Sequence, residues 1–230
     1  MIVTIDGPVA SGKSTIARTL ARRLNYFYLY SGILFRALAY ILVNHFGYSK
    51  EKLADPHEHD VYEVLKPERF VYEYDDQFRP HVFYDGVDIT PYLKDRFIDE
   101  IVTVLAGNRN IRLLLRELQH QLGDNGSDLV AEGRDMGTVV FPQADLKLYL
   151  TASLDVRAER WRMQQEQYGA EYGHDEATAI IDERDCRDCE RSVSPLCVPE
   201  GSVIIDSSTL AIEETLEQVL ARVREALAKK

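Results

Sequence analysis

The chain has 230 residues, of which 45% are hydrophobic and 28% charged, a composition typical of a globular protein with one sizeable domain or a core with small insertions. Its formal net charge of −11 argues against a nucleic-acid partner, because phosphate backbones select basic surfaces. No apolar run approaches the roughly 18 residues of a membrane helix and no basic, then apolar leader precedes the first predicted strand, so we expect a cytoplasmic protein with no membrane partner.

The first predicted element is a strand over residues 1–5, a β-branched run that Asp6, Gly7 and Pro8 end. Residues 7–15 read Gly-Pro-Val-Ala-Ser-Gly-Lys-Ser-Thr and match the phosphate-binding loop pattern G-x-x-x-x-G-K-[ST]. A helical pattern begins at Gly12, with apolar residues on one face. The motif therefore stands in the strand, loop and helix context that it requires.

This glycine loop predicts a site for the phosphates of ATP. Its glycines let the backbone approach a phosphate chain, while its amide N–H groups and the helix N-terminus supply positive partial charge. Lys13 would reach the β- and γ-phosphates, and the Ser14 hydroxyl would ligate Mg²⁺. The predicted ATP-binding residues are Gly7, Pro8, Val9, Ala10, Ser11, Gly12, Lys13, Ser14 and Thr15.

The next elements predict a parallel sheet that an insert interrupts. Residues 26–29 are a predicted strand and residues 33–46 an apolar helix, which continues the order of a parallel sheet covered by helices. Residues 47–95 differ, since the polar stretch 51–65 suggests a short helix at most. Alternating, aromatic runs at 69–74, 81–84 and 87–90, separated by tight turns, predict a small antiparallel meander.

The second half of the chain returns to alternating helices and strands. The predicted elements are a helix over 98–122 with a joint at 107–108, a turn at 124–127, strands at 129–131 and 146–150, a helix over 155–167 with Ser153 as N-cap, a loop at 169–173, a charged helix over 175–191, a strand at 202–206 and an amphipathic helix over 212–228. Ligands bind at the carboxyl ends of strands in such sheets. The glycine loop, residues 30–32 and residues 132–135 all stand at such ends.

Glu132 closes the apolar strand at 129–131 with a carboxylate. This is the usual place of the acid that orients Mg²⁺ in phosphate-loop enzymes, so we expect Glu132 to act on the metal indirectly. The alternative is an ordinary solvated strand end.

Two sets of charged residues on the later helices have helical spacing. Arg157 and Arg160 are three residues apart, and Arg184, Asp188 and Arg191 would share one helix face. Such patterns also occur on solvated surfaces. In phosphoryl transfer, however, arginine forks stabilise the charge on the transferred group, so both sets are candidates for that task.

The sequence resembles the bacterial cytidylate kinases along nearly its whole length. The most specific segments are residues 7–15, residues 133–142 (Gly-Arg-Asp-Met-Gly-Thr-Val-Val-Phe-Pro) and residues 183–188 (Glu-Arg-Asp-Cys-Arg-Asp), which Arg191, 194–196 and 206–208 extend. The resemblance implies an α/β fold: a three-layer P-loop kinase core with a parallel sheet over 1–46 and 96–230, a helical lid at about 155–192, and a small antiparallel β insert over 47–95 that binds the nucleoside monophosphate.

The resemblance also implies roles for single residues. Ser31, Thr103, Arg112 and Asp135 fall where the family recognises cytosine; Arg36, Arg134 and Arg191 where it holds the acceptor phosphate; Arg184 and Asp188 where it contacts the pentose; and Arg157 and Arg160 in the lid helix over ATP. With Lys13, the arginines Arg134, Arg157 and Arg160 are the predicted catalytic residues.

Several positions depart from the family pattern or admit another interpretation. Tyr30 replaces the usual aspartate before the Ser-Gly pair, and Lys94 and Trp161 replace arginines. The three cysteines, Cys186, Cys189 and Cys197, could suggest zinc together with a nearby histidine, but the first two lie within a predicted helix. We expect reduced thiols and no structural zinc.

The predicted function is ATP-dependent phosphorylation of CMP and dCMP in pyrimidine nucleotide metabolism, by a monomeric phosphotransferase that uses Mg²⁺. Two alternatives stay open. The chain could be a P-loop kinase for UMP or a non-nucleotide acceptor, or a nucleotide-binding regulator without catalysis, which Tyr30 would favour.

Overall fold

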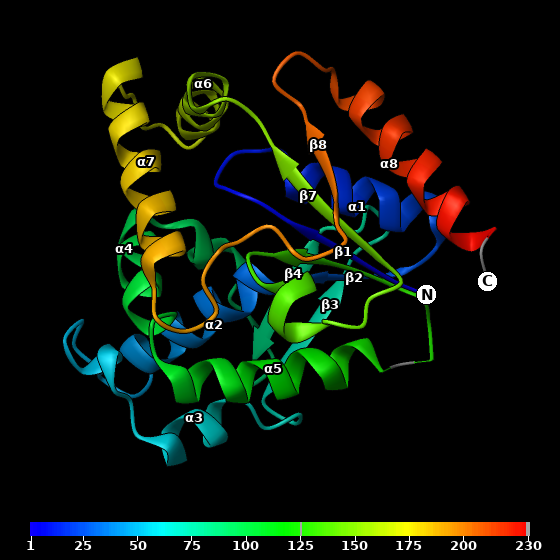
Figure 1. The fold of residues 1–230 in the computed structure, drawn as a ribbon. Helices are drawn as coiled ribbons and strands as arrows, with labels where there is room; N and C mark the ends of the chain where they lie inside the picture. Colours follow the sequence, from blue (N-terminus) through cyan, green and yellow to red (C-terminus); the bar gives the residue numbers. More distant parts are fainter. Residues whose placement is uncertain (125, 229–230) are drawn as a thin grey trace. The chain divides into compact units, whose positions relative to one another are not determined.

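The predicted strand, loop and helix at the N-terminus are present in the structure, a computed structural model that describes residues 1–124 and 126–228, apart from the side chain of Arg96. Strand β1 (Ile2–Asp6) leads into the glycine loop, and helix α1 (Lys13–Leu24) follows it (Figure 1). Helix α1 begins at Lys13 because Gly12 before it has a positive φ of 94°, which favours glycine.

Packing divides the chain into two units, Met1–Tyr26 with Asp128–Lys230, and Phe27–Ser127. The predicted division into a core over 1–46 and 96–230 and an insert over 47–95 stays a prediction.

The first unit contains parallel strands in the order β6 (Leu129–Gly133), β1, β7 (Leu146–Thr151) and β8 (Val203–Asp206). In this register Asp6 lies beside Gly133 on one side and Tyr149 on the other. Helices α1 and α8 (Ile212–Leu227) pack against each other and cover one face of these strands. Because β1 and β6 end side by side, the glycine loop lies next to the residues that follow Glu132.

Helices α6 (Leu154–Glu166) and α7 (His174–Glu190) lie against each other in the same unit (Figure 1). The predicted N-cap is confirmed, since the Ser153 hydroxyl accepts a hydrogen bond from the Val156 amide. A small core of Val9, Ala158, Ala177 and Ile181 joins the two helices to the glycine loop. The predicted lid helices therefore pack directly on the loop.

A short π-helix, η3 (Met136–Val140), follows β6 and was not expected from the sequence. It forms because the carbonyl of Asp135 accepts hydrogen bonds from the amides of both Val139 and Val140. Single-turn π-helices are often found at functional sites.

The second unit begins with β2 (Phe27–Tyr30) and α2 (Ser31–Asn44), so the predicted helix starts and ends two residues earlier than expected. The predicted meander is confirmed as an antiparallel sheet of β3 (Phe70–Tyr74), β4 (Pro80–Tyr84) and β5 (Val87–Asp88). Its last strand is shorter than predicted, since the Asp88 side chain accepts from the Thr90 amide and a 3₁₀ turn begins there.

The remaining elements of this unit are helical. They are η1 (Lys52–Ala54), α3 (Glu58–Val64), η2 (Thr90–Lys94), α4 (Arg96–Leu105) and α5 (Arg109–Gly123). The predicted joint between the last two is confirmed, because the Asn108 side chain caps α5 by accepting from the Asn110 and Ile111 amides. The predicted turn at 124–127 includes Asn125, which lies outside the described residues.

Candidate active site

The glycine loop has the backbone conformation that its motif predicts. Gly7 has a φ of 149°, and a Cβ at this position would lie 2.0 Å from the carbonyl oxygen of Leu150. Ala10 also has a positive φ of 57°. No side chain larger than that of glycine fits at Gly7, so the close passage of the loop over β7 requires this residue.

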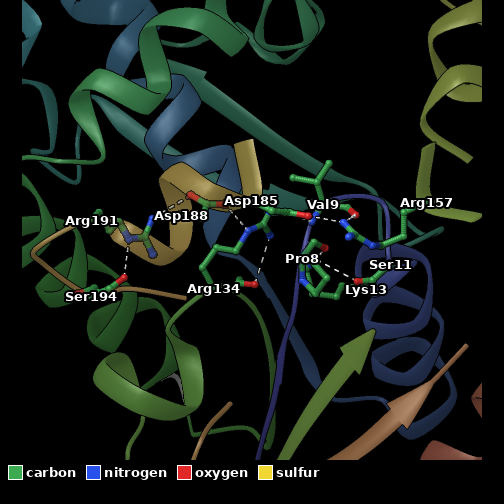
Figure 2. Close-up of polar contacts among 11 residues, drawn as sticks. Pro8, Val9, Ser11, Lys13, Arg134, Arg157, Asp185, Asp188, Arg191 and Ser194 are labelled. Atoms are coloured by element: carbon green, nitrogen blue, oxygen red, sulfur yellow. Dashed lines mark hydrogen bonds and ion pairs between the residues drawn. The ribbon is translucent and has the colours of Figure 1, made fainter. Parts of the chain in front are cut away.

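The Lys13 side chain lies inside this loop and is only 5% exposed. Figure 2 shows its Nζ atom donating hydrogen bonds to the Pro8 carbonyl at 2.5 Å and to the Ser11 hydroxyl at 3.2 Å. Burial lowers the pKa of Lys13, and the positive charge of Arg134 lowers it further. A bound anion in the loop would offset both effects, as expected of a phosphate site.

Two oxygen-bearing residues of this region suit a magnesium ion. Ser14 is exposed in the first turn of α1. Glu132 is 1% exposed on β6, and its charge acts on Lys13. Hydroxyl and carboxylate oxygens are ligands that Mg²⁺ accepts, and this ion usually keeps several of its water molecules when it is bound to a protein. The residues present therefore fit the predicted direct and indirect roles.

Residues 1–124 and 126–228 hold no group of three or more His, Cys, Asp or Glu side chains arranged for a metal ion. Cys186, Cys189 and Cys197 are exposed free thiols. None of the helices in this part of the chain combines the length and the apolar character needed to cross a bilayer.

Arg157 on α6 binds the backbone of the glycine loop. Its guanidinium donates to the carbonyl of Val9 at 3.1 Å and to that of Ala152 at 3.0 Å, and it forms an ion pair with Asp185. Asp185 on α7 in turn accepts from the Val9 amide at 2.9 Å (Figure 2). Both backbone groups of Val9 are thus held by predicted lid helices.

Arg160, one turn further along α6, reaches the loop through Ser207. It donates to the Ser207 hydroxyl at 3.0 Å and to the Ser207 carbonyl at 2.8 Å. The same hydroxyl lies 3.3 Å from the Ser11 carbonyl and 3.1 Å from the Thr151 carbonyl, and its single proton can be donated to either. The structure therefore brings both predicted lid arginines to the edge of the glycine loop.

Three of the residues predicted to bind the acceptor form one cluster, which we call the acceptor clamp: Arg134, Asp188 and Arg191. The Asp188 carboxylate accepts from Arg134 at 2.8 Å and from Arg191 at 3.2 Å (Figure 2). Although burial alone would raise the pKa of Asp188, the charges of Arg134 and Arg191 lower it, and Arg184 adds to this effect. Asp188 stays ionised and fixes the two guanidinium groups.

One expectation about this cluster was wrong. Arg191 does not share a helical face with Arg184 and Asp188, since α7 ends at Glu190 and Arg191 has an extended backbone. The helix ends there because the Leu196 amide turns back and donates to the Asp188 carbonyl at 2.8 Å. Arg191 still reaches Asp188, and its Nε also donates to the Ser194 carbonyl at 2.5 Å.

The second unit holds four of the other residues predicted for the acceptor, on α2, α4 and α5, while Asp135 and Arg184 lie in the first unit. Ser31 accepts a buried hydrogen bond of 2.7 Å from Gln119. Arg36 donates to the Leu93 carbonyl at 2.9 Å and pairs with Asp99. Ser31 and Arg36 thus each have a polar partner in the same unit, and the sequence indicated neither of these partners.

The remaining two predicted residues of this unit bind its backbone. Arg112 is 8% exposed, donates to the Ala106 carbonyl at 2.6 Å and lies over the Phe35 ring. Thr103 donates to the Glu100 carbonyl at 2.9 Å.

Tyr30, the departure from the family pattern, also contacts Arg36. Its side chain is hydrogen bonded to the guanidinium, and with the charge of Asp99 it raises the pKa of Arg36 against the opposing effect of burial. The Tyr30 ring lies over Gly32, where a Cβ would come within 2.7 Å of it. The Tyr30 side chain thus packs against residues in the first turns of α2.

Sequence reasoning missed two carboxylates of the first unit, Asp185 and Asp6. Asp185 stands within the family-specific segment 183–188, which was the available signal. Asp6 closes a buried strand, as Glu132 does, and is fully buried itself. It accepts from the Met136 amide at 2.8 Å and the Gly137 amide at 2.7 Å.

Burial raises the pKa of Asp6 from 3.8 to about 6, against the effect of these two amides. Between pH 3.8 and about pH 6, the Asp6 carboxyl is largely ionised in the unfolded chain but largely protonated in the folded protein. The unfolded chain therefore binds fewer protons than the folded protein, and the contribution of Asp6 to the free energy of unfolding falls as pH rises. We expect Asp6→Asn to remove about 2 kcal/mol of this decline between pH 4 and pH 7. Urea unfolding of both proteins across this range measures it, and parallel pH profiles would contradict the assignment.

The comparisons with known proteins agree with this geometry. The family model of cytidylate kinases matches residues 3–225. A cytidylate kinase from Thermodesulfovibrio yellowstonii is 38% identical over 97% of this chain and 98% of its own length. A second, from Desulfitobacterium hafniense, is 35% identical over 95% of this chain and 90% of its own. The chain therefore belongs to the cytidylate kinase family.

Proposed function

We propose that this chain transfers the γ-phosphoryl group of ATP to CMP and dCMP and forms the corresponding diphosphates. The observation that carries the proposal is the pairing of two cationic sites in one unit: the glycine loop around Lys13, and the acceptor clamp. The clamp's Arg134 follows β6, which lies next to the strand that carries the loop. Donor and acceptor phosphates would thus meet at the ends of neighbouring strands.

The chemistry requires positioning and charge neutralisation rather than a covalent intermediate. Lys13 and the loop amides would bind the β- and γ-phosphates, while Arg134 and Arg191 would hold the acceptor phosphate in line with them. The acceptor phosphate is largely ionised at neutral pH, so it needs no general base. Arg157 and Arg160 would neutralise charge on the transferred group once the lid closes over ATP.

A magnesium ion bound here would supply positive charge that reduces the repulsion between the phosphates of ATP and the incoming oxygen. Ser14 would hold it directly, and Glu132 through water. Closure of the insert at 47–95 and of the lid at about 155–192 would exclude water and suppress hydrolysis of ATP. The enzyme would act as a cytoplasmic monomer.

Asp135 would select cytosine, since a carboxylate can accept a hydrogen bond from its exocyclic amine. The side chain is 5% exposed at the end of β6. Ser31, Thr103 and Arg112 would complete base recognition, Arg36 would join the phosphate site, and Arg184 and Asp188 would contact the pentose.

Asp135→Ala is expected to reduce cytosine selectivity more than ATP affinity. A site built to accept a hydrogen bond discriminates against a base without the donor, and this discrimination disappears with the carboxylate. We expect kcat/KM for CMP to fall by about 100-fold while Kd for ATP changes by less than about threefold. Steady-state kinetics and calorimetry measure the two quantities separately, and a larger loss of ATP binding would contradict the role.

A coupled ADP-release assay over a panel of nucleoside monophosphates tests the function itself. We expect the highest kcat/KM with CMP and dCMP, with UMP well below both. A higher value with UMP, or turnover only with a non-nucleotide alcohol, would replace the proposed acceptor. Normal binding of ATP and CMP without ADP release would make the chain a regulator.

A further inference from the structure

Asp6 connects the strand of the glycine loop to the segment that follows β6. Both of its carboxylate oxygens are used: Oδ1 accepts from the Met136 amide and Oδ2 from the Gly137 amide. These amides follow directly after Arg134 and Asp135, which are the residues proposed for the acceptor phosphate and the base. Asp6 itself directly precedes Gly7, the first residue of the loop.

The packing around Gly137 shows how closely this segment approaches β1. A Cβ at Gly137 would lie 2.8 Å from the Thr4 hydroxyl and 3.2 Å from Oδ2 of Asp6. The segment therefore rests on β1 with no room for a side chain. Its position depends on the Asp6 carboxylate at the point where the π-helix η3 begins.

The electrostatic surroundings of Asp6 include both substrate sites. Lys13 of the glycine loop and Asp135 of the acceptor segment both act on its charge, with opposite effects. In the sheet it lies between Gly133 on β6 and Tyr149 on β7. A buried carboxylate is unfavourable unless it is hydrogen bonded, so a position chosen for stability alone would suit an apolar residue better.

We propose that Asp6 is a positioning residue for phosphoryl transfer, which holds Arg134 and Asp135 in register with the glycine loop through the amides of Met136 and Gly137. It need not touch either substrate. This inference rests on the proposed function, because it assigns Asp6 to the acceptor side of that reaction. Its loss should therefore affect CMP more than ATP.

Asp6→Asn is the direct test, since the amide keeps the shape but offers one acceptor oxygen where two are needed. We expect kcat/KM for CMP to fall by at least about 30-fold while KM for ATP changes by less than about threefold. Thr4→Val is the matched control: Thr4 is equally buried on the same strand, and its hydroxyl has no hydrogen-bond partner in the described part of the chain. Its kinetics should stay at the wild-type level.

Two outcomes would overturn the proposal. Kinetics of Asp6→Asn within twofold of wild type would show that the contact has no positioning role, and equal losses for CMP and ATP would show a general structural one. If Asp6→Asn does not fold, Gly137→Ala tests the same contact from the other side, because its Cβ displaces the segment. The same split between CMP and ATP is expected, and its absence overturns the proposal.

A substrate-free measurement separates this proposal from the proposed function. In wild-type protein, the amides of Met136 and Gly137 should be protected from hydrogen exchange, and Asp6→Asn should remove the protection of at least one of them. Amides that exchange as fast in wild type as in Asp6→Asn, in an enzyme active on CMP, would overturn this proposal alone. A wild-type protein without CMP kinase activity would remove the proposed function, and this proposal with it.

Discussion

Lys13→Ala is expected to abolish phosphoryl transfer while the fold persists. The ammonium group lies inside the glycine loop, where it donates to the Pro8 carbonyl and to the Ser11 hydroxyl. Without the Lys13 ammonium group, no fixed cation neutralises the negative charge that develops between the β- and γ-phosphates. We therefore expect kcat to fall by more than about 10³-fold. The coupled ADP-release assay with saturating CMP measures the effect.

Stability should change little in this variant, because loss of the two hydrogen bonds is offset by relief of a buried charge. The melting temperature should stay within about 4 °C of wild type. Arg22→Ala is the matched control, since Arg22 is an exposed cation on the same helix. A Lys13→Ala enzyme with near-native kcat, or a control with the same loss, would rule out the assigned role.

Arg191→Met is expected to raise KM for CMP or lower kcat, with a loss of about 100-fold in kcat/KM. The methionine keeps an unbranched apolar stem but removes a cation from the acceptor clamp. Asp188 retains Arg134 as its partner at 2.8 Å, so the fold should lose no more than about 4 °C in melting temperature. Steady-state kinetics with CMP and a thermal melt measure both effects.

Arg187→Met on α7, four residues before Arg191, is the matched control. Arg187 pairs with Glu183 at 2.9 Å, and both side chains are more than half exposed. Such a surface pair contributes about 0.3–0.5 kcal/mol to stability and nothing to turnover. If Arg191→Met kept native kinetics like this control, the acceptor clamp would be ordinary surface and the acceptor site would have to lie elsewhere.

The parts of the site that could be predicted are those encoded by neighbouring residues. The glycine loop is one uninterrupted motif between a strand and a helix, so its conformation follows from local spacing. Arg134 and Asp188 were identified by family-specific segments, and the structure brings their side chains together. Alternation and turn residues likewise sufficed for the antiparallel meander, because its strands pair with their sequence neighbours.

Contacts between distant residues could not be predicted in this way. Asp6 binds amides 130 residues later in the chain, and Asp185 binds an amide 176 residues earlier. No periodicity carries that information. The expectation that Arg191 shares a helical face with Arg184 and Asp188 was wrong for a related reason, since the charged run offers no stop signal before Pro195. The helix ends instead through the backbone hydrogen bond from Leu196 to Asp188.

The central claim is that the glycine loop and the acceptor clamp serve one reaction, the transfer of a phosphoryl group from ATP to CMP. The most direct test incubates the purified chain with ATP, Mg²⁺ and CMP and quantifies all four nucleotides by chromatography. We predict one CDP formed for each ADP released, with no ADP in the absence of an acceptor. ADP release without CDP, or no release at all with CMP or dCMP, would contradict the account.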